Sequence, residues 1–277
     1  MKITVITVVY NDLEGLKKTA NSVLNQTCTD FEYIILDGGS TDGCVEYMNT
    51  LKFRGQKKSE PDNGIYNAMN KAVKMATGDY CLFLNAGDTF CDEFVIEKAN
   101  QKLGVADIYV GSTVEIGEIP QKFPAPYPMT VGHLMRTSIY HQSTFTRRTL
   151  LLQYPYNENH KIVSDWEFFF ERWLAGCSYD KLDFFVSNYY LGGFSYEHRD
   201  LIDIERQEVI DRLVPRRIRE YYESEIQSHM NSPEIIEKPK SKLESKLEIA
   251  MKLPPISRDL KILRNAFKAL VKDMFKL

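Results

Sequence analysis

Polar side chains suited to holding a ligand follow several apolar runs of this sequence. Asn11, Asp37 and Asp88 each stand at or just after the end of a short apolar run. The carboxyl ends of parallel strands meet at one edge of an open α/β sheet, which is where such sheets bind ligands. Carboxylates that converge there need a cation or hydrogen-bond donors to offset their repulsion. One such Asp is often only a turn former, but several at one edge predict a ligand site.

The apolar runs and the segments between them predict how these side chains are positioned. Continuous β-branched or aromatic runs favour buried strands, and apolar residues three and four apart favour helices. We expect strands at 3–9, 31–36, 80–84, 108–116 and 183–187, and helices at 16–24, 45–51, 67–76, 92–103, 165–175 and 202–219. Four prolines between residues 120 and 128 exclude a helix or a central strand there. This alternation of strands and helices is typical of an α/β fold.

Composition excludes several classes of protein. The 277 residues are 43% hydrophobic and 26% charged, unlike a disordered or collagen-like chain. The net charge of −3 gives a nucleic-acid partner no electrostatic support, so we expect none. The five cysteines form no CxxC pair and predict free, buried or half-buried thiols. Neither GxGxxG nor GxxxxGK(S/T) is present, which argues against dinucleotide or P-loop binding.

Four ordered motifs resemble those of a known family. They are VVYN at 8–11, DGGSTDG at 37–43, EPDNGIY at 60–66 and GDYCLFLNAGD at 78–88. In this order and spacing they resemble the inverting family 2 glycosyltransferases, and the resemblance covers about residues 1–200. The last two motifs are similar to the branch that builds bacterial colanic acid, exopolysaccharide and capsule. The resemblance implies a GT-A fold, which is a Rossmann-like mixed α/β sheet flanked by helices, here with a helical C-terminal extension.

The resemblance also implies a site for a nucleotide-sugar donor, with UDP as the expected nucleotide. Its donor-binding residues would be Val9, Tyr10, Asn11, Asp37, Asp62, Asn85, Ala86 and Gly87. Asp37 would accept a hydrogen bond from the base, and Asp62 would contact the nucleoside or the sugar. Asp88 lies in the metal-binding region, where Mg²⁺ or Mn²⁺ would bridge the two phosphates and stabilise the leaving diphosphate.

The sequence departs from the family pattern at two places. The common metal-binding segment is Asp-Ala-Asp-Asp, whereas residues 85–88 are Asn-Ala-Gly-Asp and keep only the last carboxylate. Asn85 still offers an oxygen that suits Mg²⁺ or Mn²⁺, so we expect a weaker metal site or one held mainly by phosphates and water. An Ala-Arg-Asn segment of many relatives reads Ala-Met-Asn at 68–70, so a basic phosphate contact is missing or supplied elsewhere.

An inverting transfer needs a carboxylate that deprotonates the acceptor hydroxyl as it attacks the anomeric carbon. The segment SDWEF at 164–168 resembles the family segment whose Asp has this role. We therefore expect Asp165 to be the catalytic base, with Glu167 as the second candidate. Without the upstream motifs, the helix dipole alone would explain an acid in the first turn of a helix.

Two histidines are further candidates. His141 belongs to a segment, HQS, that resembles one preceding the base in this branch, so it would touch the donor phosphates or the acceptor, or else be structural. His198 follows the segment GGFS at 192–195. Because a late histidine is a metal ligand in some GT-A enzymes, His198 is a candidate ligand beside Asp88.

The charge distribution sets the C-terminal part of the chain apart. Residues 1–200 carry a net charge of −6, whereas residues 201–277 carry +3. We expect a catalytic domain at 1–200, with a nucleotide-sugar half at about 1–110 and an acceptor half at about 111–200. We expect an extension at 201–277 after it. This extension would contain a polar linker at 228–246 and a basic amphipathic helix at 256–277. That helix would lie on an anionic membrane surface, or pack on the catalytic domain or on a second copy.

These expectations favour an enzyme that moves a sugar from a nucleotide sugar to a hydroxyl of a saccharide or lipid-linked saccharide in bacterial surface polysaccharide biosynthesis. The altered metal segment leaves a non-catalytic nucleotide-sugar-binding or scaffold protein of the same fold as the alternative. A nucleotidyltransferase would need a glycine-rich basic loop after the first strand, which YND at 10–12 lacks. No apolar stretch reaches the roughly 18 residues that span a membrane, so we expect a cytoplasmic protein, with peripheral contact to the inner membrane face left open.

Overall fold

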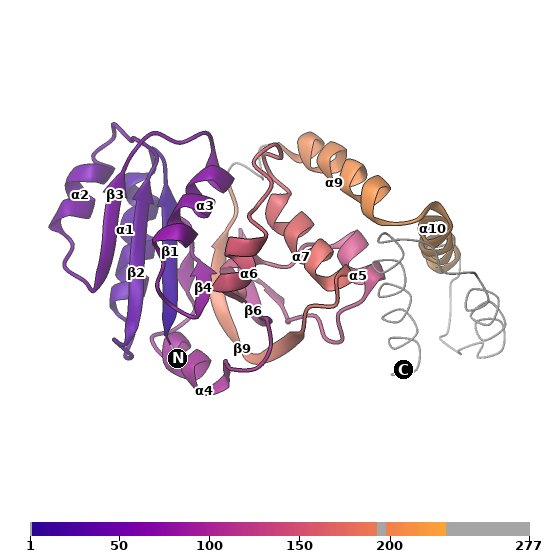
Figure 1. Cartoon of the computed structure of the whole chain (residues 1–277), viewed down its shortest axis with the longest axis horizontal. Coiled ribbons are helices and arrows are strands. Elements are labelled where there is room, and N and C mark those ends of the chain that lie inside the picture. Colours follow the sequence, from indigo (N-terminus) through magenta and orange to yellow (C-terminus); the bar gives the residue numbers. More distant parts are fainter. Residues whose placement is uncertain (1, 193–197, 231–277) are drawn as a thin grey trace.

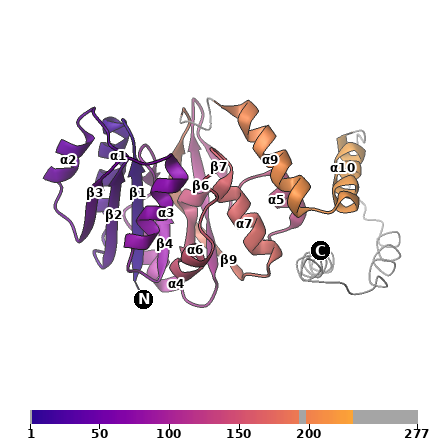
Figure 2. The same cartoon turned by 45° about the horizontal axis from the view of Figure 1, so that its top comes forward.

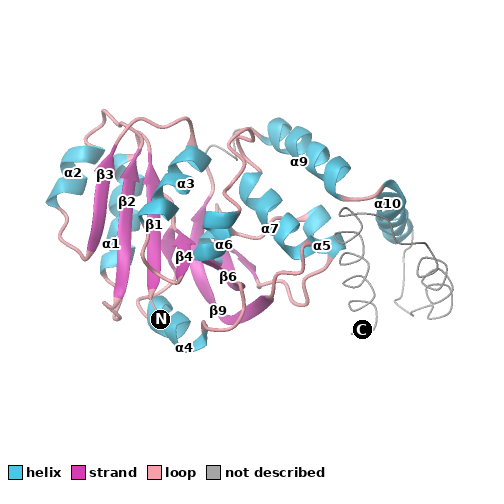
Figure 3. Ribbon diagram, viewed as in Figure 1, coloured by secondary structure: helices cyan, strands magenta, loops and turns pink. Residues whose placement is uncertain are grey.

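A mixed β-sheet runs through the centre of the structure, and helices lie against both of its faces (Figure 1; Figure 3). The computed structural model describes residues 2–192 and 198–230. Within these residues the sheet has nine strands, eight of them in the order β3-β2-β1-β4-β8-β6-β9-β5. The ninth strand, β7, pairs with β6 outside this path.

The N-terminal half has the strand-and-helix alternation that the sequence predicts. Its elements are β1 (Ile3–Val9), α1 (Leu13–Leu24), β2 (Phe31–Asp37), α2 (Cys44–Thr50), β3 (Gly55–Ser59), α3 (Ile65–Met75) and β4 (Tyr80–Phe83). These four strands pair in parallel, with Val9 directly opposite Asp37. The loops after β1 and β2 therefore start at the same edge of the sheet.

The rest of the sheet is mixed, with β6 and β9 paired in parallel and the other pairs antiparallel. The next elements are β5 (Thr89–Phe90), α4 (Val95–Lys102), β6 (Ile108–Ile116), β7 (Gln121–Phe123), α5 (Val131–Arg136), a 3₁₀ turn (His141–Ser143), β8 (Thr144–Arg147), α6 (Arg148–Gln153), α7 (Ser164–Leu174) and β9 (Tyr179–Tyr190). Strand β8 lies antiparallel between β4 and β6, and so joins the two halves into one sheet.

Alternate residues of β1 enter two apolar layers. Ile6 and Val8 belong to a cluster that reaches α3, α5 and α7, whereas Ile3 and Val5 belong to one that reaches α1, α2 and α4. Because side chains alternate across a strand, this pattern places one helical layer on each face. The sheet and its loops are thereby held rigidly between two cores.

The chain continues into two helices beyond the sheet, α9 (Arg199–Leu213) and α10 (Arg216–Met230). Helix α9 lies along α7 (Figure 2), and its Val209 is fully buried in the cluster that also holds residues of α7. The expected domain boundary at residue 200 thus falls in the first turn of a helix that packs on the sheet-bearing part. Within the described residues, none of the helices is long and apolar enough to cross a membrane.

Several predicted boundaries differ from the structure. The helix predicted at 92–103 begins only at Val95, and the strand predicted at 183–187 is the middle of the longer β9. The helix predicted at 202–219 is interrupted at Pro215, whose ring cannot continue a helix interior, so α9 and α10 are separate.

Two further predictions concern the end of the chain. Helix α10 extends to Met230, so it reaches three residues into the segment 228–246 that is predicted to be a linker. The remainder of the linker and the basic helix at 256–277 lie outside the described residues. The prediction of free thiols is confirmed, since all five cysteines are free, two of them buried and three half-buried.

Candidate active site

The loop after β2 surrounds the carboxylate of Asp37. This fully buried side chain accepts, at Oδ2, hydrogen bonds from the backbone N–H groups of Gly39 and Ser40, both at 3.0 Å, and from the Ser59 hydroxyl at 2.6 Å. Its other oxygen, Oδ1, is buried and has no hydrogen-bond partner among the described residues. One oxygen fixes the loop, and the other is left as an unused acceptor.

Asn11 joins the loop after β1 to the loop after β2. Its Oδ1 accepts a hydrogen bond from the Thr41 N–H at 2.9 Å, and its own N–H donates to the Ser40 hydroxyl at 2.8 Å. The residue has a φ of 49°, a left-handed conformation that Asn adopts more readily than most residues. Asn11 therefore ties the two loops to each other. The ring of the preceding Tyr10 is 65% exposed.

Gly38 lets Tyr10 and Asp62 approach the backbone closely. A Cβ atom on Gly38 would lie 2.5 Å from Asp62 Oδ2 and 3.3 Å from the Tyr10 ring. Asp62 Oδ1 accepts a hydrogen bond from the Gly64 N–H at 2.8 Å, directly before α3 begins. Two expected donor-site residues, Tyr10 and Asp62, thus approach the residue that follows Asp37 so closely that only a glycine fits there without displacing them.

The turn after β4 presents Asn85 and Asp88. The Thr19 hydroxyl of α1 donates to the Asp88 carbonyl at 2.6 Å and lies 3.2 Å from the Asn85 carbonyl. Gly87 has a φ of 99°, which other residues rarely adopt. Asn85 Nδ2 lies 3.3 Å from His141 Nε2, whereas Asn85 Oδ1 is buried and without a partner among the described residues.

Burial raises the pKa of Asp88 to about 7. The charge of His141 and the Tyr190 N–H, which donates to Asp88 Oδ1 at 3.2 Å, offset this only in part. The carboxylate is therefore held in a place that favours the neutral form unless a cation compensates it.

Asp165 lies in the first turn of α7 and has two polar partners. The Tyr66 hydroxyl of α3 donates to its Oδ1 at 2.8 Å, and His141 Nδ1 lies 2.7 Å from its Oδ2. The Tyr66 hydroxyl also contacts the Ile162 carbonyl. Three segments that are distant in the sequence meet at this carboxylate, and His141 connects it to Asn85.

The contacts among Asp165, His141 and Tyr66 shift the pKa of each of these groups. Burial tends to raise the pKa of Asp165, but the hydrogen bond and charge of His141, together with the Tyr66 hydroxyl and the Trp166 N–H, hold it below its usual value. Burial tends to lower the pKa of His141, but Asp165 outweighs this and raises it. Burial and the Asp165 charge raise the pKa of Tyr66, so its hydroxyl stays a donor. Asp165 is therefore ionised at neutral pH.

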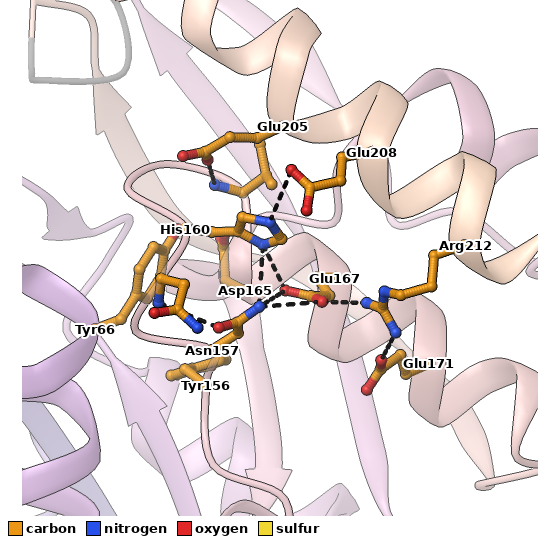
Figure 4. A network of polar contacts seen from close by, with 12 residues as sticks. Tyr66, Tyr156, Asn157, His160, Asp165, Glu167, Glu171, Glu205, Glu208 and Arg212 are labelled. Atoms are coloured by element: carbon orange, nitrogen blue, oxygen red, sulfur yellow. Dashed lines mark hydrogen bonds and ion pairs between the residues drawn. The ribbon is translucent and has the colours of Figure 1, made fainter.

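Glu167 points into a different group of side chains (Figure 4). Its carboxylate is 4% exposed, lies 2.7 Å from His160 Nδ1 and contacts the Arg212 guanidinium of α9. Residues two apart in a helix do not share a face, so Glu167 and Asp165 point in different directions. A cavity of about 290 Å³ lies beside Glu167; its lining includes Tyr154, Asn157, Glu171 and Arg212.

His198 directly precedes α9, and its carbonyl accepts hydrogen bonds from the N–H groups of Leu201 and Ile202. Among residues 2–192 and 198–230, no group of three or more His, Cys, Asp or Glu side chains is placed to hold a metal ion. The unpartnered Asn85 Oδ1 and the only partly compensated Asp88 carboxylate nonetheless fit a cation that takes its other ligands from phosphate and water.

Sequence reasoning assigned no role to Tyr66 or to Glu205 of α9. Tyr66 belongs to the EPDNGIY motif, so its position was marked by the resemblance although its partner was not. Glu205 accepts hydrogen bonds from the N–H groups of residues 161–163, directly before α7. It belongs to a helix whose charged sequence gives no local signal of burial.

Solved structures share this fold. TarS of S. aureus, in complex with UDP-GlcNAc, matches with a TM-score of 0.55 at 19% identity, over 72% of this chain and 61% of that one. The mannosyltransferase PcManGT of Pyrobaculum calidifontis, in complex with GDP-Man and Mn²⁺, matches with a TM-score of 0.54 at 13% identity, over 99% of this chain and 86% of that one. The prediction of a GT-A fold is confirmed.

Relatives found by sequence similarity are named glycosyltransferases. The PGL/p-HBAD biosynthesis glycosyltransferase of Mycobacterium bovis is 31% identical over 156 residues, which are 53% of this chain and 60% of that protein. The chain thus spans about three fifths of the length of such curated relatives. The family described as "Glycosyl transferase family 2" matches residues 4–165, a segment that holds all four motifs and ends at Asp165. This chain therefore belongs to glycosyl transferase family 2.

Proposed function

We propose that this protein transfers a sugar from a nucleotide sugar, with UDP as the nucleotide, to a hydroxyl group of a saccharide or lipid-linked saccharide, with inversion at the anomeric carbon. Its setting would be the synthesis of a bacterial surface polysaccharide. One observation carries the proposal: an ionised carboxylate, Asp165, is fixed by His141 beside the Asn85–Asp88 turn. This places a proton acceptor next to the turn proposed to hold the donor diphosphate.

The surface formed by Tyr10, Gly38 and Asp62 is the proposed nucleoside site. The unpartnered Asp37 Oδ1 is suited to accept the N3–H of a uracil base, since a buried acceptor without a partner is costly. The exposed Tyr10 ring offers a face for stacking. TarS, whose solved structures include UDP and UDP-GlcNAc complexes, has the same fold and supports this assignment.

Asn85 and Asp88 would hold a divalent cation, Mg²⁺ or Mn²⁺, together with the donor diphosphate. When bound, this ion would neutralise the charge that develops on the leaving nucleoside diphosphate. The Mn²⁺ complex of PcManGT supports this assignment. His198 remains a further candidate ligand.

Asp165 would act as the base. It removes the proton of the acceptor hydroxyl while the acceptor oxygen forms a bond to the anomeric carbon, and the bond from that carbon to the diphosphate breaks on the opposite side. The electron pair leaves with the nucleoside diphosphate, and the proton stays on Asp165 until solvent removes it. Tyr66 and His141 keep the carboxylate oriented throughout.

A thermal-shift screen with UDP-Glc, UDP-GlcNAc, UDP-Gal and GDP-Man, each with Mg²⁺ or Mn²⁺, tests the donor assignment, because a bound ligand raises the melting temperature. We expect stabilisation by the UDP-sugars and release of UDP on prolonged incubation, with the release lost in Asp88→Ala. Stabilisation without any release of nucleoside diphosphate would instead support a non-catalytic binding protein.

The basic segment 256–277 is proposed to address the enzyme to a lipid-linked acceptor on an anionic membrane surface, or else to a second copy. Flotation with anionic liposomes separates these two roles. We expect the full chain to float and a chain ending at Ser241 to stay in the pellet fraction. Equal partitioning of the two would exclude the membrane role, and a change in oligomeric state on truncation would support the second.

A further inference from the structure

Helix α9 lies beyond the segment that matches the family, yet its Glu205 contacts the backbone that leads into Asp165. The Glu205 carboxylate is 6% exposed and accepts hydrogen bonds from the N–H groups of Lys161 at 2.7 Å, Ile162 at 3.0 Å and Val163 at 3.2 Å. Figure 4 shows Glu205 reaching down from its helix to this segment. One buried carboxylate thus fixes three consecutive peptide groups directly before α7.

That segment also carries a direct contact of the active site. The Ile162 carbonyl contacts the Tyr66 hydroxyl, whose single proton is donated to Asp165. If the segment shifted, Tyr66 would lose its contact with the Ile162 carbonyl, and the first turn of α7 would move with the segment. Three N–H groups that lose a buried partner remain unsatisfied, so this shift is opposed as long as Glu205 is in place.

The next residue of α9, Arg206, fixes the segment that leads to His141, which is the partner of Asp165. Its guanidinium donates to the Met135 carbonyl at 3.3 Å and to the Ser138 hydroxyl at 3.1 Å, and it lies 4.4 Å from the centre of the Trp166 ring. These contacts tie the segment that leads to His141 onto the first turn of α7.

Other contacts of α9 serve to dock the helix. Arg212 contacts Glu167 and Glu171 of α7, and the Glu208 carboxylate lies 3.9 Å from His160 Nε2. Apart from Val209, the buried side chain within α9 is that of Glu205. Ile202, Ile210 and Leu213 also pack, partly buried, against the same apolar cluster as Val209. The helix is therefore attached through both apolar and charged contacts.

We propose that α9 positions the catalytic pair: Glu205 holds the segment that carries Asp165, and Arg206 holds the segment that leads to His141. Both are positioning residues, since neither side chain is placed against the donor or acceptor. The proposal rests on the proposed role of Asp165 as the base. It implies that the family segment alone, which ends at Asp165, lacks the contacts that set the geometry of its own base.

The hydrogen bond between His141 and Asp165 gives a direct readout in the full chain without any ligand. In ¹⁵N-labelled protein we expect a downfield Nδ1 proton resonance of His141, assigned by its loss in His141→Leu, that moves upfield in Asp165→Asn. In Glu205→Gln it should move the same way, because an amide offers one acceptor oxygen to three N–H groups. In Asp200→Asn, an exposed carboxylate on the same helix, it should stay in place.

A folded Glu205→Gln protein with an unchanged His141 resonance would overturn the proposal. Arg206→Lys provides a second test if Glu205→Gln does not fold, since Lys keeps the charge but cannot reach both acceptors with a planar fork. The same upfield movement is expected there, and a resonance identical to that of the wild type would contradict it.

A double-mutant cycle separates positioning from general damage. For the release of UDP from UDP-GlcNAc with Mn²⁺, we expect Glu205→Gln to lower kcat at least fivefold with KM changed less than twofold, and to have no further effect in the Asp165→Asn background. Equal losses in both backgrounds would overturn the proposal. If Asp165→Asn itself keeps full activity, the proposed function fails instead, and the NMR result for Glu205 still stands separately.

Discussion

His141 Nδ1 and Asp165 Oδ2 lie 2.7 Å apart, although 24 residues separate them in the sequence. His141 comes from the 3₁₀ turn before β8, and Asp165 from the first turn of α7. Tyr66 binds the same carboxylate from one side, and Asn85 contacts the imidazole from the other. A continuous line of polar contacts therefore runs from α3 to the turn after β4, and it joins the proposed base to the proposed metal segment.

Asp165→Asn should lower the rate of nucleoside diphosphate release by about 10²–10⁴-fold, because a positioned base contributes that much to proton transfer. The amide keeps the size of the carboxylate but cannot take up the proton. UDP affinity, measured by calorimetry, should stay within a few-fold of the wild type. Asp180→Asn removes an exposed carboxylate and is the control; an Asp165→Asn protein as active as this control would contradict the assignment.

His141 should be replaceable by a side chain that keeps the donor to Asp165. In His141→Asn, the amide nitrogen takes roughly the place of Nδ1, whereas His141→Leu has no donor at all. We expect His141→Leu to be at least about tenfold slower in steady-state turnover than His141→Asn. Equal and severe losses in both variants would mean that the imidazole itself takes the proton.

Asp37→Asn should weaken UDP binding by about 10- to 100-fold, since a hydrogen bond to a charged acceptor contributes about 1.5–3 kcal/mol. The amide can satisfy the Gly39 and Ser40 N–H groups only by turning its NH₂ toward the base. Isothermal calorimetry with UDP measures the effect. Ser59→Ala removes a hydrogen bond to the opposite oxygen and should leave UDP affinity nearly unchanged.

Gly38→Ala should displace Asp62 and the Tyr10 ring, because the new Cβ would lie 2.5 Å from Asp62 Oδ2 and 3.3 Å from the Tyr10 ring. We expect UDP affinity to fall several-fold while the protein still folds. The matched change Gly104→Ala adds a methyl group where no atom lies within 4 Å, and it should leave affinity intact. Titration of both variants with UDP measures their affinities. Identical affinities would show that the nucleoside binds elsewhere.

Asp88 should make stability depend on pH in the absence of divalent cations. Burial raises the pKa of Asp88 to about 7 in the folded state, whereas an unfolded Asp titrates near about 3.9. Between these values the folded protein binds more protons, so the contribution of Asp88 to stability is lost as pH rises from about 4 to 7. Relative to the wild type, Asp88→Asn should therefore gain melting temperature across this range and level off above it.

Calorimetry from pH 4.5 to 8.5 checks this expectation. The exposed-site variant Asp180→Asn should show no such trend. UDP with Mn²⁺ should reduce the gain of Asp88→Asn, because a cation stabilises the ionised carboxylate. A melting-temperature difference that is independent of pH would show that Asp88 titrates normally.

The ends of β1, β2 and β4 could be predicted because the residues that mark each strand are consecutive in the sequence. The runs that form β1, β2 and β4 are predominantly apolar and buried along their whole length, and the polar residues at their ends had to lie at one sheet edge. Strand β3, by contrast, was not predicted. All five of its residues are exposed and it contains no apolar side chain, so neither alternation nor an apolar run marks it.

The partners of the site residues were less predictable than the residues themselves. Asp165 was found through a motif, but its hydrogen bond to Tyr66 spans 99 residues, and that between Glu205 and Lys161 spans 44. Such contacts depend on how α3, α7 and α9 pack, and no short pattern encodes that packing. Glu167 lies only two residues from Asp165, yet the sequence gave no indication that its carboxylate binds His160 and Arg212.

Strand β3 also bears on how copies of this protein can meet. It forms one edge of the sheet, and its exposed sequence carries Lys57 and Lys58. Lysines on an open edge oppose the approach of another strand, because pairing would bring like charges together and strip their water. Sheet-to-sheet growth through β3 is thus disfavoured, which opposes aggregation at this edge of the sheet.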